Sequence, residues 1–179
     1  MRRRAELLYQ QLDALAKIRR ETRRGLLSES RKHPAHELLG EIPRLGLIRV
    51  ALVIALLQTP HRFRTKRQLW AYCGLGLQTW ISGEYRVSEG RLQHGKKAPA
   101  LRGLNENHNH DLKGLFKSAA TQVSAGKDPL GEFYENLLSK GMKPAMARLT
   151  LARKIAAIVL TVWKKGARFD PEQLKAKCA

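Results

Sequence analysis

The chain has 179 residues, a length that suits one globular domain with an extension. Its 34 lysines and arginines outnumber its 15 aspartates and glutamates, which gives a net charge of +19. An excess of this size is larger than solubility requires, so it favours a polyanionic partner and makes a purely solubilising role or an anionic lipid surface the weaker alternatives.

Cysteine usage and hydropathy exclude several other classes of protein. Cys73 and Cys178 are the only cysteines, so the sequence has no disulfide framework and no CxxC metal clip. The longest apolar runs are shorter than the roughly 20 residues of a membrane span. Polar residues follow Arg2 to Arg4 where an export signal would be apolar. We therefore expect a cytoplasmic protein without a membrane partner.

The first predicted element is a helix from about Ala5 to Ser28. Its spacing of three, four and seven resembles a short coiled coil and involves Leu8, Leu12, Leu15, Thr22 and Leu26. The apolar side of this helix either forms a dimer seam or packs on its own domain. Its basic side is either solvated or touches nucleic acid.

After the break at His33-Pro34, a short helix is predicted from Ala35 to Leu39. A turn over residues 40–46 leads into an apolar helix from about Leu47 to Gln58. This order is the plan of a helix-hairpin-helix, whose turn offers backbone N–H groups to a phosphate. A plain helical hairpin without that role is the alternative.

Residues 61–67 then carry four firm positive charges and one aromatic ring, and they lead into a short helix from Gln68 to Tyr72. The β-favouring residues 77–81 and 85–87 flank Ser82-Gly83, which predicts a small hairpin or an extended loop with Ser82 at its tip. Residues 90–103 lack apolar periodicity, so we expect a mobile basic loop there.

Three more helices are predicted, over residues 109–124, 129–138 and 144–165. The last is the most apolar, and its core face should exclude Lys143, Arg148 and Arg153. The expected organisation is a basic amphipathic helix over residues 1–33, a domain over residues 34–167 and a polar tail over residues 168–179. The expected fold class is mainly α: a helix-hairpin-helix-containing domain with a small β-hairpin or extended loop and a long N-terminal helix.

Six short motifs follow one another along the chain. They are Ile42-Pro43-Arg44-Leu45-Gly46, Arg62-Phe63, the block from Gln68 to Leu75, Ser82-Gly83, the Asn109 to Lys113 helix start, and Ala147-Arg148 with Ala152-Arg153-Lys154. Each is unspecific alone, but the six in this order resemble the C-terminal domain of the IS110, IS116 and IS902 insertion-sequence transposases. The resemblance covers roughly residues 38–169.

The resemblance implies a two-part transposase in which a serine of the C-terminal domain attacks DNA, helped by an N-terminal RNase-H-like domain with acidic metal ligands. The position that matches the serine is Ser82, which would otherwise be an ordinary turn residue. Serine suits this role because a phosphoserine ester retains the bond energy needed to rejoin a strand. The resemblance also implies a guide RNA as a possible partner and a homo-oligomer.

Cations must surround the phosphate and the transition state, and the sequence offers many near Ser82. The predicted DNA contacts are Arg44, Arg62, Arg64, Lys66, Arg67, Arg86, Arg91, Lys96, Lys97, Arg102 and Lys113. Most of these would contact the DNA backbone or remain solvated, rather than act in the transition state.

No metal site is predicted in this chain. The aspartates lie on unrelated segments, and a spacing of two does not place His108 and His110 on one helical face. We therefore expect the acidic half to be missing, as in a fragment or the product of a truncated gene, and expect Mg²⁺ to enter only with that half.

Two features depart from the family pattern. Arg44 stands where the family's turn normally carries glycine, so an ionic contact with phosphate would replace close backbone approach. The stretch from Ser82 to Asn109 is also long, and His108 stands where a glycine is usual. We assign that extra length to the mobile loop predicted over residues 90–103.

Two other functions compete with a transposase domain. One is a non-catalytic nucleic-acid-binding module or a decayed transposase remnant, which would bind DNA without forming a covalent adduct. The other is an RNA-binding structural protein, which the aromatic content of 6% disfavours because RNA readers stack bases on aromatic rings.

Overall fold

The computed structural model describes residues 2–80, 85–88, 90–94, 100–126 and 128–171, and it is mainly α-helical, as the sequence predicts. The helices are α1 (Arg2–Arg31), α2 (Ala35–Gly40), α3 (Gly46–Leu57), the 3₁₀ turn η1 (Pro60–Arg62), α4 (Lys66–Tyr72), α5 (His110–Val123), α6 (Pro129–Ser139) and α7 (Pro144–Lys165). The predicted helices are therefore confirmed, with small changes at their ends.

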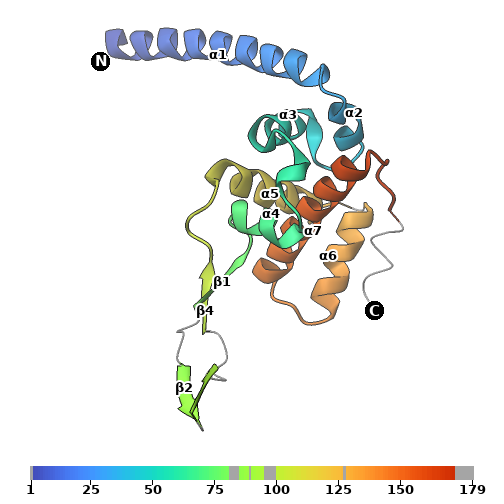
Figure 1. The fold of residues 1–179 in the computed structure, drawn as a ribbon. Coiled ribbons are helices and arrows are strands. Elements are labelled where there is room, and N and C mark those ends of the chain that lie inside the picture. The colour runs from blue at the N-terminus through green and yellow to red at the C-terminus, as the bar shows by residue number, and fades with distance from the viewer. Residues whose placement is uncertain (1, 81–84, 89, 95–99, 127, 172–179) are drawn as a thin grey trace.

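Helix α7 lies at the centre of the body and contacts α2, η1, α4, α5 and α6 (Figure 1). Its fully buried residues include Leu151, Ile155 and Val159. Phe116 of α5 and Leu130 of α6 are also fully buried and belong to the same core. Burial of each such side chain stabilises the folded state by roughly 1.5–3 kcal/mol. The packing of other helices on α7 is therefore a main source of the stability of the fold.

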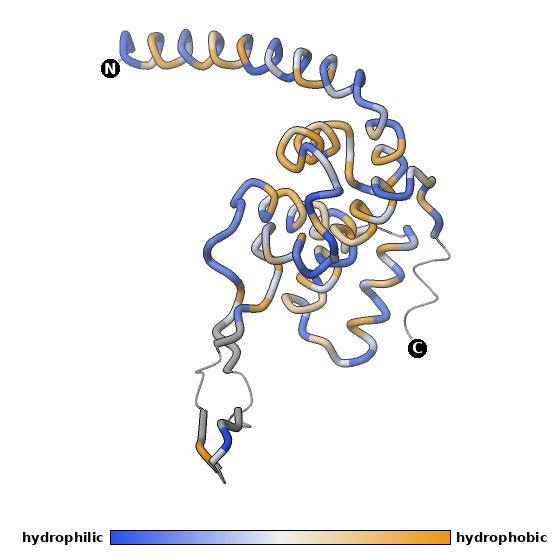
Figure 2. Tube along the Cα trace, viewed as in Figure 1, coloured by the Kyte–Doolittle hydropathy of each residue, from blue (hydrophilic) through white to orange (hydrophobic). Residues whose placement is uncertain are grey.

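Helix α1 extends away from this body (Figure 1). The residues between Arg2 and Gly25 are exposed, including six large apolar side chains: Leu7, Leu8, Tyr9, Leu12, Leu15 and Ile18. Figure 2 shows hydrophobic and hydrophilic residues alternating along the helix. Contact with the body is made near the end of α1, where Ser30 Oγ and His36 Nδ1 form a buried hydrogen bond of 2.7 Å. Most of α1 therefore does not pack on its own domain.

Four short strands form an arm that leaves the body near α4 (Figure 1). They are β1 (Leu77–Trp80), β2 (Tyr85–Ser88), β3 (Arg91–His94) and β4 (Ala100–Leu104). β1 pairs antiparallel with β4, with Leu77 opposite Leu104. β2 pairs antiparallel with β3, with Ser88 opposite Arg91.

This pairing corrects two predictions. Of the two alternatives around Ser82, the hairpin is wrong, because β1 pairs with β4 and β2 with β3; the extended loop falls on residues 81–84, which lie outside the described residues. The segment 90–103 is also not an unstructured loop, since it contains β3 and most of β4. Sequence reasoning missed these strands because β3 and β4 are only four and five residues long and contain polar, basic and glycine residues, which weakens the alternation that marks a strand.

Within the described part of the chain, no helix combines the length and the apolar character needed to cross a membrane.

Candidate nucleic-acid interface

The basic segment 61–67 lies on η1 and the start of α4, and local hydrogen bonds fix its backbone. Pro60 begins η1, where Thr59 accepts a hydrogen bond from the His61 N–H. A capping box begins α4: the Thr65 side chain accepts from the Gln68 N–H, and Gln68 Oε1 accepts from the Thr65 N–H. These caps satisfy donors that the helix start would otherwise leave without partners.

Aromatic rings support two cations of this segment. The Arg62 guanidinium carbon lies 5.3 Å from the centre of the Tyr72 ring and 5.8 Å from that of Phe63. Lys66 Nζ lies 5.6 Å from the centre of the Trp70 ring. Both basic residues remain exposed. The rings therefore hold the cations in place while leaving them accessible to an anion.

Phe63 fixes the same segment to α7. Its side chain is buried, and its ring lies 5.4 Å from that of Tyr72. Its backbone carbonyl accepts a hydrogen bond from Lys164 Nζ, near the end of α7. Arg64, just before the capping box, and Arg67, within it, are exposed. Arg62, Arg64, Lys66 and Arg67 thus lie together on one braced segment.

The remaining predicted DNA contacts are distributed over other elements. Arg91 begins β3 and is exposed, whereas Lys113 lies half-buried in the first turns of α5. Arg86 and Arg102 belong to β2 and β4 by their backbone. The predicted nucleophile Ser82, together with Lys96 and Lys97, lies outside the described residues.

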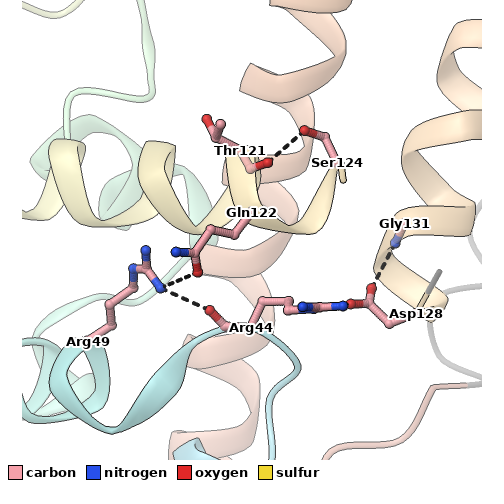
Figure 3. A network of polar contacts seen from close by, with 7 residues as sticks. All are labelled: Arg44, Arg49, Thr121, Gln122, Ser124, Asp128 and Gly131. Carbon is pink, nitrogen blue, oxygen red and sulfur yellow. Dashed lines mark hydrogen bonds and ion pairs between the residues drawn. The ribbon is translucent and has the colours of Figure 1, made fainter. Parts of the chain in front are cut away.

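Arg44 is bound to the body by an ion pair (Figure 3). Its Nε donates to Asp128 Oδ2 at 2.9 Å, and Asp128 Oδ1 accepts from the Gly131 N–H at 2.9 Å, which caps α6. A side chain at Gly126 would collide with this guanidinium, since a Cβ there would lie 2.7 Å from Arg44 Nη2. The carboxylate offsets part of the positive charge that Arg44 would offer to DNA.

The backbone of Arg44 explains why glycine suits its position. Its φ is +61°, in the left-handed region that side chains other than glycine, asparagine and aspartate rarely adopt. The ion pair with Asp128 helps to hold the residue in that conformation.

Arg49 braces the same turn against α5 (Figure 3). Its Nη1 donates to the Arg44 carbonyl at 3.2 Å and to Gln122 Oε1 at 2.8 Å. Its Nε donates to Ser118 Oγ at 3.2 Å. The order helix, turn, helix is therefore present in α2 and α3, and side chains from α5 and α6 hold its turn.

A histidine pair lies where the chain returns from β4 to α5. The rings of His108 and His110 are 4.4 Å apart, and both ring nitrogens of His108 are buried without a hydrogen-bond partner. The His108 ring fills the space that a side chain at Gly74 would need. Among the described residues, no group of three or more histidines, cysteines or acidic residues could hold a metal ion.

The neighbouring Cys73 is not available for chemistry. It is fully buried, and this burial raises its pKa to about 12, so the thiol remains protonated at neutral pH. Its reactivity should accordingly be low.

The profile of the transposase IS116/IS110/IS902 family matches residues 36–135, more than half of the chain. The chain belongs to this transposase family, and a role in transposition follows from that membership. A search of curated proteins found no match.

Sequence reasoning missed three residues that shape this region. Asp128 precedes Pro129 and a helical pattern, which is a recognisable capping signal. Trp70 and Arg153 gave no such signal, because their contact joins residues 83 positions apart. Arg153 was expected away from the core face, yet it is only half-exposed and one of its guanidinium nitrogens is buried.

Replacement of Asp128 by alanine tests the bracing of the turn. We expect the free energy of unfolding to fall by about 1–2 kcal/mol, because the α6 cap is lost together with a partly exposed ion pair. Urea denaturation measures this change. Glu132→Ala is the matched control, since Glu132 is an exposed acid in the first turn of the same helix. Its effect should stay within about 0.5 kcal/mol, and equal effects of the two variants would contradict the bracing role.

Proposed function

We propose that this chain binds DNA through the basic segment 61–67 and presents Ser82 as the nucleophile of DNA strand exchange. The observation that carries the proposal is the family match, which spans both the basic segment and position 82. The exposed cations on η1 and α4 and the net charge of +19 support the DNA-binding part.

The proposed reaction is a transesterification at a DNA phosphate. Ser82 Oγ attacks the phosphorus and loses its proton to a base, so one P–O bond forms between serine and DNA. The P–O bond to the departing strand breaks, and the alcohol of that strand takes up a proton. The serine ester is a phosphodiester too, so the reverse attack rejoins a strand without a high-energy cofactor.

Cations near the phosphate are needed to stabilise the charged transition state. Arg91 is exposed on β3 of the arm, and Arg86 and Arg102 belong to β2 and β4. We propose that these arginines, with Lys96 and Lys97, contact the DNA that Ser82 attacks. Arg44 and Lys113 remain candidates for contacts with the DNA backbone.

Serine is weakly acidic, so the proposed reaction needs a base or a metal ion to activate it. We propose that an RNase-H-like segment outside this chain supplies Mg²⁺ ligands. A guide RNA would select the DNA sequence. This chain alone would then bind DNA without completing recombination.

One gel experiment separates a transposase domain from a binding module without chemistry. The chain, supplemented with an RNase-H-like segment of a family member and Mg²⁺, is mixed with labelled DNA. We expect retarded complexes on native gels and, in addition, a labelled band that survives denaturation. Ser82→Ala should retain the retarded complex and lose the stable band, because only the nucleophile is removed.

Ser88→Ala is the matched control, since Ser88 belongs to the same arm on β2. It should form the stable band, and mass spectrometry should find the nucleotide on the peptide that contains Ser82. A band that persists in Ser82→Ala would remove this serine from the proposed mechanism. Affinity should also fall steeply between about 50 and 200 mM salt, and an affinity indifferent to salt would contradict binding to phosphates.

We further propose that α1 pairs with α1 of a second copy of this chain. Its exposed apolar residues between Leu7 and Ile18 include a repeat of three and four at Leu8, Leu12 and Leu15. That stretch contains one acid, Asp13, and one base, Lys17, so its charges cancel. Two copies can therefore meet along this stretch without net repulsion, since the arginines of α1 come before it and after it in the sequence.

Leu12→Glu tests this pairing because it places a charge in the centre of the apolar seam. Sedimentation velocity at micromolar concentration should show an oligomer for the unmodified chain and a monomer for the variant. Gln10→Glu adds the same charge to the opposite side of α1 and should leave the oligomer intact. A monomeric unmodified chain, or an oligomer that survives Leu12→Glu, would refute the seam.

A further inference from the structure

Trp70 and Leu75 form a closed set of hydrogen bonds with Arg153, a residue far from both in the sequence, and we name this set the Trp70–Arg153 clasp. Trp70 Nε1 of α4 donates to the Arg153 carbonyl at 2.9 Å, and Arg153 Nε of α7 donates to the Leu75 carbonyl at 2.6 Å. The Leu75 N–H then donates to the Trp70 carbonyl at 2.8 Å. The clasp thus joins α4, α7 and Leu75, two residues before the arm.

The position of the clasp is the root of the arm. Leu75 is fully buried, and β1 begins two residues later at Leu77. The returning chain is held from the other side: the Asn105 N–H donates to the Gly76 carbonyl at 3.1 Å, and Asn105 Nδ2 donates to the Ala71 carbonyl at 3.1 Å. Both ends of the arm therefore meet at α4, and Arg153 ties the outgoing end to α7.

An arginine at position 153, next to the root of the arm, lowers the stability of the fold. Arg153 Nη2 is buried without a hydrogen-bond partner, and burial lowers the pKa of the guanidinium. A partly buried guanidinium with one buried, unsatisfied donor destabilises the fold relative to an apolar side chain of similar size. The directional hydrogen bond from Nε to the Leu75 carbonyl is what arginine adds and an apolar side chain lacks.

We propose that Arg153 is a positioning residue, which sets the direction in which the arm leaves the body by holding the Leu75 carbonyl against α7. The consequence for catalysis rests on the proposed function of Ser82, whereas the effect on the direction of the arm does not.

Distance measurements between spin labels test this effect without any reaction. One label is placed at Gln78→Cys on β1 and the other at Lys117→Cys on α5, both exposed positions. Cys178→Ser removes the tail thiol, and the buried Cys73 thiol stays protonated and unlabelled. Pulsed electron resonance then gives the distribution of distances between the arm and the body.

Arg153→Met removes the hydrogen bond, and Arg153→Lys keeps the charge but loses the donor geometry of the guanidinium. We expect both to broaden or shift the distance distribution relative to the unmodified chain. Arg148→Met is the matched control, because Arg148 is an exposed arginine five positions earlier on α7, and it should leave the distribution unchanged. Circular dichroism reports whether each variant retains its helices.

An unchanged distribution in a folded Arg153 variant would overturn the proposal. Should Arg153→Met fail to fold, the result for Arg153→Lys decides. Loss of the fold in both variants would make Arg153 a structural residue and would equally overturn the proposal.

The covalent-adduct assay separates this proposal from that for Ser82. At saturating DNA, Arg153→Met should slow adduct formation on the order of 10- to 100-fold, as small misplacements of reacting groups do, with DNA affinity little changed. Absence of the adduct in every form of the chain, with the distance distribution still broadened, would refute only the serine mechanism. An adduct rate equal to that of the unmodified chain would refute the catalytic consequence of the clasp.

Discussion

The burial of α7 is the constraint on which the rest of the structure depends. Its core face contacts five other elements, and three hydrogen bonds at its edges reach the segments that the proposed function uses. Lys164 holds the carbonyl of Phe63, the carbonyl of Arg153 holds Trp70, and Arg153 Nε holds Leu75. A single helix therefore positions the basic segment, helix α4 and the root of the arm relative to one another.

This arrangement separates rigid and projecting parts in a way that suits a protein acting on DNA. Helix caps, aromatic rings and the buried Phe63 hold segment 61–67 in place, so its cations would lose little conformational entropy in the proposed contact with phosphates. The arm and most of α1 extend beyond the core instead (Figure 1). Arg44 differs from the cations of segment 61–67, because it forms an ion pair with Asp128. A basic residue in a predicted binding turn can therefore have a structural partner.

The sequence predicted the helices well because apolar periodicity and the break at His33-Pro34 are local signals. It failed for the arm, where β1 pairs with β4 across about twenty intervening residues and no local pattern specifies that partner. The clasp was equally beyond prediction, since Trp70 and Arg153 meet only through the packing of α4 on α7. For the site, the basic residues of segment 61–67 are neighbours in the sequence, so their grouping is a local feature, whereas the pairing of Arg44 with Asp128 depends on tertiary structure.

Native-state hydrogen exchange tests most directly whether α7 determines the position of the arm root. The amides of Leu75 and Gly76, which donate to the Trp70 carbonyl, should open only together with the buried stretch of α7 around Leu151 and Ile155. Their opening free energies should therefore approach that of the helix. Rapid exchange of Leu75 and Gly76 while α7 remains protected would show that the arm root moves independently, and would contradict the account.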